Sequence, residues 1–152
     1  MGNYNLEKFV AESNSIEGIT RSPTDKELIT YEKFMNLNFF SLADLQNLVS
    51  VVQPGAILRN KEGLDVRIGK HFPPSGGPLI LKNLEELIIV ARSLTENPFT
   101  IHVMYEDLHP FTDGNGRSGR AIWAWMMVKQ YGGFPLGFLH HWYYQSLENI
   151  RI

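Results

Sequence analysis

Residues 121–128, AIWAWMMV, restrict the fold more than any other segment, because eight consecutive side chains are apolar or aromatic. A helix that is hydrophobic on every face is stable only when other elements surround it. Gly132 and Gly133 follow shortly afterwards and are typical of a helix end. The segment therefore predicts a buried central helix around which the rest of the chain is built.

Most of the remaining chain reads as amphipathic helices, with apolar side chains three and four residues apart. One helix opens with the capping-box sequence TDKE, residues 24–27, and another starts at SLAD, residues 41–44. We expect an all-α fold with helices over 4–17, from 24 onward, from 41 to Pro54-Gly55, around 84–94, around 98–108, and over 140–150.

One segment departs from this pattern. Leu64, Val66 and Ile68 alternate with Asp65 and Arg67, which is the two-residue period of a half-buried strand. ILRN before the turn KEG, and LDVRI after it, therefore predict one small β-hairpin over residues 57–72.

Composition excludes several classes of function. The 152 residues suit a single domain with its own core, and a net charge of -2 gives no basic surplus for binding a nucleic acid. No cysteine is present, which rules out disulfides, thiolate nucleophiles and cysteine zinc sites. The N-terminal residues lack a signal-peptide pattern, and no apolar run has membrane-spanning length. We therefore expect a cytoplasmic protein.

The loop HPFTDGNGRSGR, residues 109–120, precedes the central helix and carries the chemistry. A helix that starts near Asn115 presents unpaired N–H groups, and Gly114 and Gly116 let an anion approach them closely. Arg117 and Arg120 are three residues apart and share a helix face. Two guanidinium groups beside a helix N-terminus indicate a polyphosphate ligand.

Two further side chains supply reactive groups. Asp113 can hold Mg²⁺ against phosphate oxygens, and His109 can act as a base toward an incoming hydroxyl. The pattern is not a P-loop or a dinucleotide fingerprint, since Lys-Ser/Thr does not follow the glycines and no strand precedes them. A zinc site of His102, His109 and Asp113 has no known ligand spacing, so we interpret His102 as a buried structural histidine.

HPFTDGNGR followed by Arg120 resembles the signature of the Fic family, His-Pro-Phe-x-Asp/Glu-Gly-Asn-Gly-Arg-x-x-Arg, at every specified position. LDVRIGKHFPP resembles the family's flap, and WYYQSLENI resembles its helix with paired tyrosines. The resemblance implies a single Fic domain over residues 1–152 that transfers AMP from ATP to a Ser, Thr or Tyr hydroxyl of a target protein. The flap would pair with a segment of that target.

The resemblance also assigns roles to individual residues. His109 would be the catalytic base, Phe111 would anchor the loop in the core, and Asp113 would hold Mg²⁺. The expected nucleotide-binding residues are Ile68, Gly69, Lys70 and His71 of the flap, Asp113, Gly114, Asn115, Gly116, Arg117 and Arg120 of the loop, and Tyr143.

SNSIEG, residues 13–18, resembles the inhibitory motif Ser/Thr-x-x-x-Glu-Gly/Asn of self-restrained Fic proteins. The resemblance implies an inhibitory helix near residues 8–18, in which Ser13 and Glu17 belong to the motif. Glu17 would pair with Arg120 and compete with the γ-phosphate of ATP.

Other activities remain open at this point. Doc-type phosphotransferases share the fold but carry Lys where this chain has Gly116, which favours AMP transfer here. Transfer of UMP or another nucleotide-derived group, removal of AMP, and a non-catalytic binding module are the further alternatives. The expected partners are ATP and an unknown target protein, with self-modification and a homo-oligomer also considered, and no nucleic acid or membrane.

Overall fold

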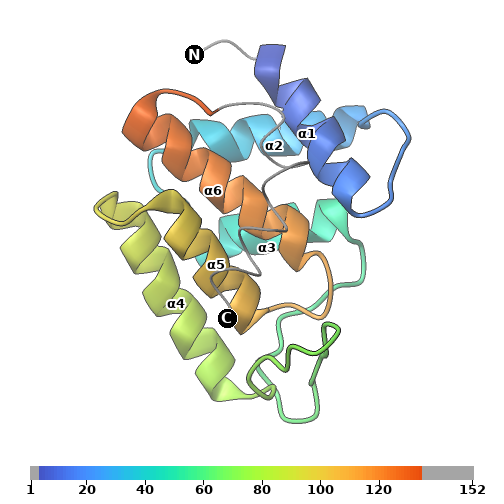
Figure 1. Cartoon of the computed structure of the whole chain (residues 1–152), viewed down its shortest axis with the longest axis vertical. Coiled ribbons are helices and arrows are strands. Elements are labelled where there is room, and N and C mark those ends of the chain that lie inside the picture. The colour runs from blue at the N-terminus through green and yellow to red at the C-terminus, as the bar shows by residue number, and fades with distance from the viewer. Residues whose placement is uncertain (1–3, 135–152) are drawn as a thin grey trace.

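The computed structural model describes residues 4–134, and this part of the chain forms six helices (Figure 1). They are α1 Tyr4–Ile16, α2 Asp25–Asn36, α3 Leu42–Val52, α4 Pro78–Ser93, α5 Pro98–Leu108 and α6 Asn115–Tyr131. The expected all-α fold is therefore confirmed. Within that part of the chain, no helix combines the length and the apolar character needed to cross a membrane.

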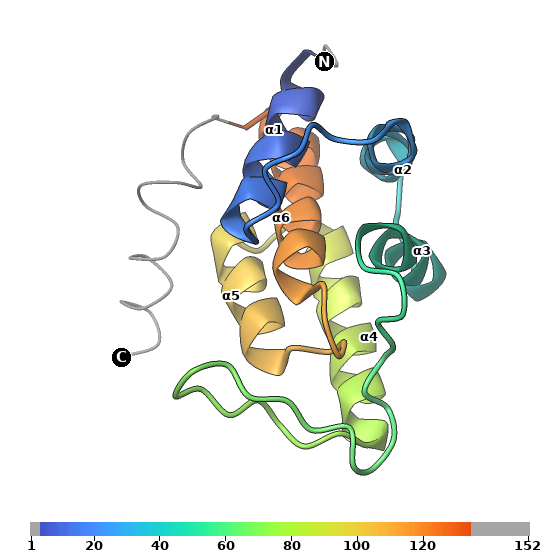
Figure 2. The same cartoon turned by 90° about the vertical axis from the view of Figure 1, so that its right-hand side faces the viewer.

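Helix α6 is the central helix that the apolar segment predicts. It contacts each of the other five helices, and Figure 2 shows it with α5 on one side and α2 and α3 on the other. Ala121, Ile122, Ala124, Trp125 and Met126 are fully buried. Gly132 ends the helix with a left-handed φ of 79°, a conformation that glycine adopts without strain.

Local signals also fix the other helix ends. Thr24 and Glu27 form the expected capping box of α2, and Ser41 and Asp44 form another at the start of α3. Helix α4 begins earlier than its apolar spacing indicates, at Pro78, because proline at the first helical position needs no N–H partner. Helix α5 ends at Leu108 and α6 begins at Asn115, so residues 109–114 form the loop that joins them.

The structure does not confirm the hairpin over residues 57–72. Within residues 4–134 this segment has only isolated bridges, one between Leu58 and Phe111 and one between Ile68 and His71. Residues 57–59 pair with the loop 110–112 through Arg59 N–H to the Pro110 carbonyl and Thr112 N–H to the Ile57 carbonyl. The first expected strand is therefore joined to the loop, and no bridge joins it to residues 64–68 in the described part of the chain.

The alternation from 64 to 68 nevertheless corresponds to a difference in exposure. Leu64, Val66 and Ile68 are half-buried, whereas Asp65 and Arg67 are exposed. Figure 2 shows residues 60–76 (green) as an open loop below the end of α5. The alternation of apolar and polar residues thus marks which side of the loop faces the protein, although the loop is not part of a sheet.

Candidate functional site

His109 lies at the junction between α5 and the loop, and its backbone is unusual. It caps α5 in a left-handed conformation, with φ 51° and ψ 61°, which costs a non-glycine residue about 1–2 kcal/mol. Nδ1 lies 3.2 Å from the carbonyl of Glu106, which can only accept a hydrogen bond. Nδ1 is therefore the donor, and the lone pair of the neutral ring is on Nε2, as a general base requires.

Arg59 stabilises this junction through hydrogen bonds to its backbone. The side chain is fully buried and donates to four backbone carbonyls: Nε to His109 at 2.7 Å, Nη2 to Leu108 at 2.9 Å, and Nη1 to Leu64 and Pro74, each at 2.9 Å. Burial lowers the pKa of Arg59 from its ordinary value, an effect that the nearby Asp65 opposes. One side chain thus joins the strained backbone of His109 to both ends of the flap loop.

The loop is also fixed from within. Phe111 is buried, as expected for an anchor, and its backbone N–H and carbonyl both bond to the side-chain amide of Asn115, at 2.9 and 2.8 Å. The side chain of Asn115 is therefore committed to the loop. Only its backbone N–H is left to face a ligand.

The first turn of α6 has the donors expected of an anion site. The first backbone hydrogen bond runs from Ser118 N–H to the Gly114 carbonyl, and no side chain among residues 4–134 caps this helix end. The N–H groups of residues 115–117 therefore precede the helical hydrogen-bond ladder. Gly114 has a φ of 77°, which turns the chain sharply into the helix and favours glycine.

Asp113 is exposed at the edge of this turn. Its Oδ1 accepts a hydrogen bond of 2.8 Å from Gly114 N–H, and no bond to Oδ2 is present in the described part of the chain. No cluster of three or more possible metal ligands occurs among residues 4–134. A single exposed carboxylate fits Mg²⁺, which commonly binds through one or two carboxylates together with water and substrate phosphates.

Arg120 is almost completely buried and is bound by α1. Nε donates to Ser13 Oγ at 2.8 Å, and Nη2 donates to the Ser13 carbonyl at 3.0 Å and to Glu17 Oε2 at 2.5 Å. The Glu17 side chain is 39% exposed, so the carboxylate meets the guanidinium at the protein surface. The two residues of the N-terminal motif therefore contact the second arginine of the loop.

The Glu17 carboxylate also lies against Gly116. A Cβ atom at Gly116 would be 2.6 Å from Glu17 Oε2 and 3.0 Å from Arg120 Nη1. Both atoms are the ends of long side chains, so a residue larger than glycine here would displace the Glu17–Arg120 ion pair. The carboxylate thus lies where an anion would approach the first turn of α6.

Arg117 has a different environment on the other side of the same turn. Nη2 donates to Gln53 Oε1 at 2.7 Å, and no carboxylate pairs with this guanidinium in the described residues. Nε and Nη1 are buried and have no hydrogen-bond partner within residues 4–134. Arg117 therefore retains both its charge and unused donors.

The C-terminal end of α1 is attached to α2 by Glu27. Asn14 Nδ2 lies 3.5 Å from Glu27 Oε2, and Arg21 Nη1 donates to Glu27 Oε1 at 2.8 Å. Burial by itself raises the pKa of Glu27. Hydrogen bonds from Arg21 and Thr24, together with the charge of Arg21, outweigh this effect and lower the pKa to about 2. The carboxylate is therefore ionised and holds the turn that follows Glu17.

The flap residues lie at a tight turn. Ile68 and His71 exchange both backbone hydrogen bonds, and Gly69 between them has a φ of 56°. His71 Nε2 is 3.2 Å from the Asp107 carbonyl, in the last turn of α5. Lys70 is exposed. The turn thus lies beside the helix end that carries His109.

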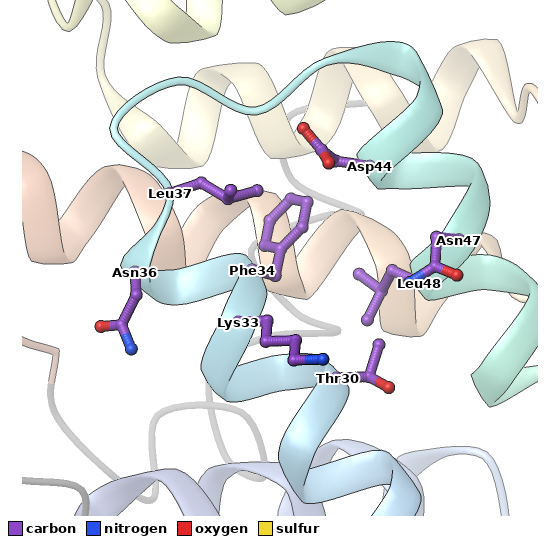
Figure 3. Close-up of a pocket in the computed structure, with 8 residues that line it drawn as sticks. All are labelled: Thr30, Lys33, Phe34, Asn36, Leu37, Asp44, Asn47 and Leu48. Atoms are coloured by element: carbon purple, nitrogen blue, oxygen red, sulfur yellow. The ribbon is translucent and has the colours of Figure 1, made fainter.

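Two other features belong elsewhere. Tyr143 and the helix expected over 140–150 lie outside the described residues. A surface hollow between α2 and α3 contains none of the expected site residues (Figure 3). Its lining consists of Thr30, Lys33, Phe34, Asn36, Leu37, Asp44, Asn47 and Leu48.

Sequence reasoning missed three groups that act on this site. Arg59 was part of the expected hairpin, Gln53 only preceded a helix stop, and Glu27 was only a capping residue. Arg59 and Gln53 reach partners about fifty and sixty-four residues away, which no local pattern reveals. The capping box did mark Glu27, but its contact with Asn14 depends on how α1 packs.

Comparisons with known proteins agree with this geometry. The sequence model of the Fic/DOC family matches residues 29–127, which is more than half of the chain. The protein adenylyltransferase Fic of Drosophila melanogaster is 28% identical over 141 residues, covering 84% of this chain and 27% of its own length. The protein of the same name from Culex quinquefasciatus is 25% identical over 158 residues, covering 93% and 30%.

The chain spans less than a third of the length of these relatives. The matched region includes α3 to α5, the loop and most of α6. The chain belongs to the Fic/DOC family.

Proposed function

We propose that this Fic/DOC family chain is a protein adenylyltransferase that moves AMP from ATP to a Ser, Thr or Tyr hydroxyl of a target protein. One observation carries the proposal: His109, with Nδ1 committed as a donor, precedes an uncapped helix N-terminus flanked by two buried arginines. A base beside a polyphosphate site is the arrangement that nucleotidyl transfer to a hydroxyl needs. The names of the relatives agree with this activity.

In the proposed reaction, His109 Nε2 takes the proton of the target hydroxyl. The hydroxyl oxygen then forms a bond to the α-phosphorus of ATP, and the bond from that phosphorus to the bridging oxygen of the β-phosphate breaks. Pyrophosphate leaves, and AMP remains on the target. Catalysis arises mainly from positioning and from stabilisation of negative charge.

The loop would hold the leaving phosphates. The N–H groups of Asn115 and Gly116 point out of the first turn and would bind the α- and β-phosphates. Arg117 and Arg120 would bind the outer phosphates. Asp113 would hold Mg²⁺, which would neutralise part of the phosphate charge when bound.

Glu17 would restrain this activity. Its carboxylate pairs with Arg120 and lies against Gly116, so it uses the guanidinium and the space that the γ-phosphate would need. ATP could then bind only with its phosphates displaced. The restraint would be released when α1 withdraws or when Glu17 is replaced.

The flap turn at residues 68–71 would bind the target. It lies beside the end of α5, with Gly69 and Lys70 exposed at its tip, and the flap would pair with an extended segment of a partner protein. Such pairing would bring the target hydroxyl to His109. The turn would also cover the nucleotide.

The test uses wild type, Glu17→Gly and Glu17→Gly/His109→Ala, each incubated with Mg²⁺ and ATP labelled at the α- or the γ-phosphate. Protein-bound label is then read on a gel, with a lysate supplied as a source of target. Label from the α-phosphate alone, strongest in Glu17→Gly and absent without His109, supports both the transfer and the restraint. Label from the γ-phosphate alone would replace the proposal with phosphotransfer.

A further inference from the structure

Gln53 is placed by α3 directly beside the proposed nucleotide site. It is the C-terminal capping residue of α3, with its N–H bonded to the Val49 carbonyl at 2.8 Å. Its Cβ lies 3.1 Å from the position of a Cβ at Gly114, the residue that turns the chain into α6. The backbone of Gln53 is thus fixed against the base of the loop.

The side chain of Gln53 makes one hydrogen bond and keeps one group unused. Oε1 accepts from Arg117 Nη2 at 2.7 Å, whereas no hydrogen bond from Nε2 is present within the described part of the chain. Arg117 itself has two buried donors, Nε and Nη1, that lack partners there. Gln53 Nε2 and Arg117 Nε and Nη1 are therefore available as donors, on the side of the loop that the Glu17 carboxylate does not contact.

We infer that Gln53 is a positioning residue that orients Arg117 toward the outer phosphates of the nucleotide. The inference rests on the proposed nucleotide site and adds a residue to it. An amide oxygen fixes the direction of the guanidinium but leaves its positive charge uncompensated. The Nε2 group is a further donor that a phosphate oxygen can accept.

The chemical type of this residue matters because of the contrast with Glu17. A carboxylate at position 53 would form a charge-assisted pair with Arg117 and compete with the phosphates for the same donors. The neutral amide gives the orientation without the competition. Gln53 thus sets how strongly the chain binds a phosphate chain that extends beyond the α-phosphate.

The test measures binding of AMP, ADP and ATP by titration calorimetry in the Glu17→Gly background. Two variants keep the Cβ atom of residue 53 beside Gly114. Gln53→Met removes both polar atoms, and Gln53→Glu introduces a carboxylate. Gln46→Glu, on an exposed position of the same helix, is the matched control for added charge. Thermal unfolding of each variant checks that the fold is kept.

The expected result depends on the number of phosphates. Gln53→Met should weaken ADP and ATP binding about tenfold, the effect of one hydrogen bond to a charged group, and leave AMP binding nearly unchanged. Gln53→Glu should weaken ADP and ATP further, and Gln46→Glu should change none of the three.

Equal losses for all three nucleotides would overturn the inference, because a merely structural role does not distinguish them. Unchanged affinities in Gln53→Glu would overturn it as well. The binding pattern does not require transfer to occur. A loss that grows with phosphate number, in a chain that transfers no label, would therefore support Gln53 and contradict only the proposed reaction.

Discussion

The two arginines of the loop are three residues apart on one helix, yet two different parts of the chain hold them. Arg120 is bound from α1 by Ser13 and by the Glu17 carboxylate. Arg117 is bound from α3 by the neutral amide of Gln53. One guanidinium thus has a negatively charged partner, and the other has a neutral one.

The residues that contact the two arginines also differ in their place relative to the family match. Helix α3 belongs to the region that the Fic/DOC family model matches, whereas α1 precedes it. The residue that contacts Arg117 is therefore within the matched region, and the residues that contact Arg120 come before it. Under the proposed function, a segment outside the matched region would restrain the site by binding a single guanidinium.

The largest expected effect comes from Arg59, which supports His109 and the flap and contacts neither Arg117 nor Arg120. Arg59→Met in the Glu17→Gly background deletes four hydrogen bonds beneath His109 and the flap, and a displacement of about 1 Å at a reacting group can cost about a hundredfold in rate. We expect a loss of that order in label transfer, with a smaller loss in Arg59→Lys. Full activity in Arg59→Met would show that the flap and loop are held by other contacts.

The next largest effect should come from loosening the α1 side while keeping its charge. Ser13→Ala removes the hydroxyl that accepts from Arg120 Nε, so the guanidinium is held by one bond fewer. Transfer should rise by a few fold, up to about tenfold, and should remain below that of Glu17→Gly. Ser15→Ala, at an exposed position of the same helix, is the matched control. A larger rise in Ser15→Ala would contradict the role of Ser13.

A smaller effect is expected where α1 is attached to α2. Glu27→Gln weakens the contacts with Asn14 and Arg21, which lie on either side of Glu17 in the chain. Transfer should rise about twofold, because the Glu17–Arg120 contact itself is untouched. Asp25→Asn, an exposed carboxylate in the same first turn, should have no effect.

The smallest expected effect is a dependence of thermal stability on pH, and it also comes from Glu27. The folded pKa of Glu27, about 2, lies below its ordinary 4.5, so its contribution is complete above about pH 4.5 and is lost as pH falls through about 2. Wild type should unfold about 2–4 °C above Glu27→Gln at neutral pH. The difference should shrink between about pH 4.5 and 2. A constant difference in melting temperature over that range would contradict the pKa.

Features that depend on neighbouring residues could be predicted from the sequence. The capping box at Thr24, the end of α6 at Gly132 and the burial of residues 121–126 all follow from short local patterns. The loop could also be singled out as the candidate site, because glycines, arginines and a histidine stand together in the chain. The contact of Glu17 with Arg120 could be expected only through a resemblance, since 103 residues separate the two.

Features that depend on distant partners could not be predicted. The alternation at 64–68 has the period of a strand and predicts a hairpin, but among the described residues, 57 and 59 pair with the loop at 110–112 and not with 64–68. Gln53 gives no local signal, since a polar residue before Pro54-Gly55 is ordinary at a helix end. Its contact exists only because α3 packs against the start of α6.

The restraint that we propose requires the Glu17 carboxylate to occupy the position that the γ-phosphate would take at Arg120. The most direct measurement compares ATP and ADP binding by calorimetry in wild type and in Glu17→Gln, which removes the charge and keeps the shape. The claim predicts that the ratio of ATP to ADP affinity rises about tenfold in Glu17→Gln, since one charge-assisted contact becomes available to the γ-phosphate. An equal ratio in the two proteins would contradict it.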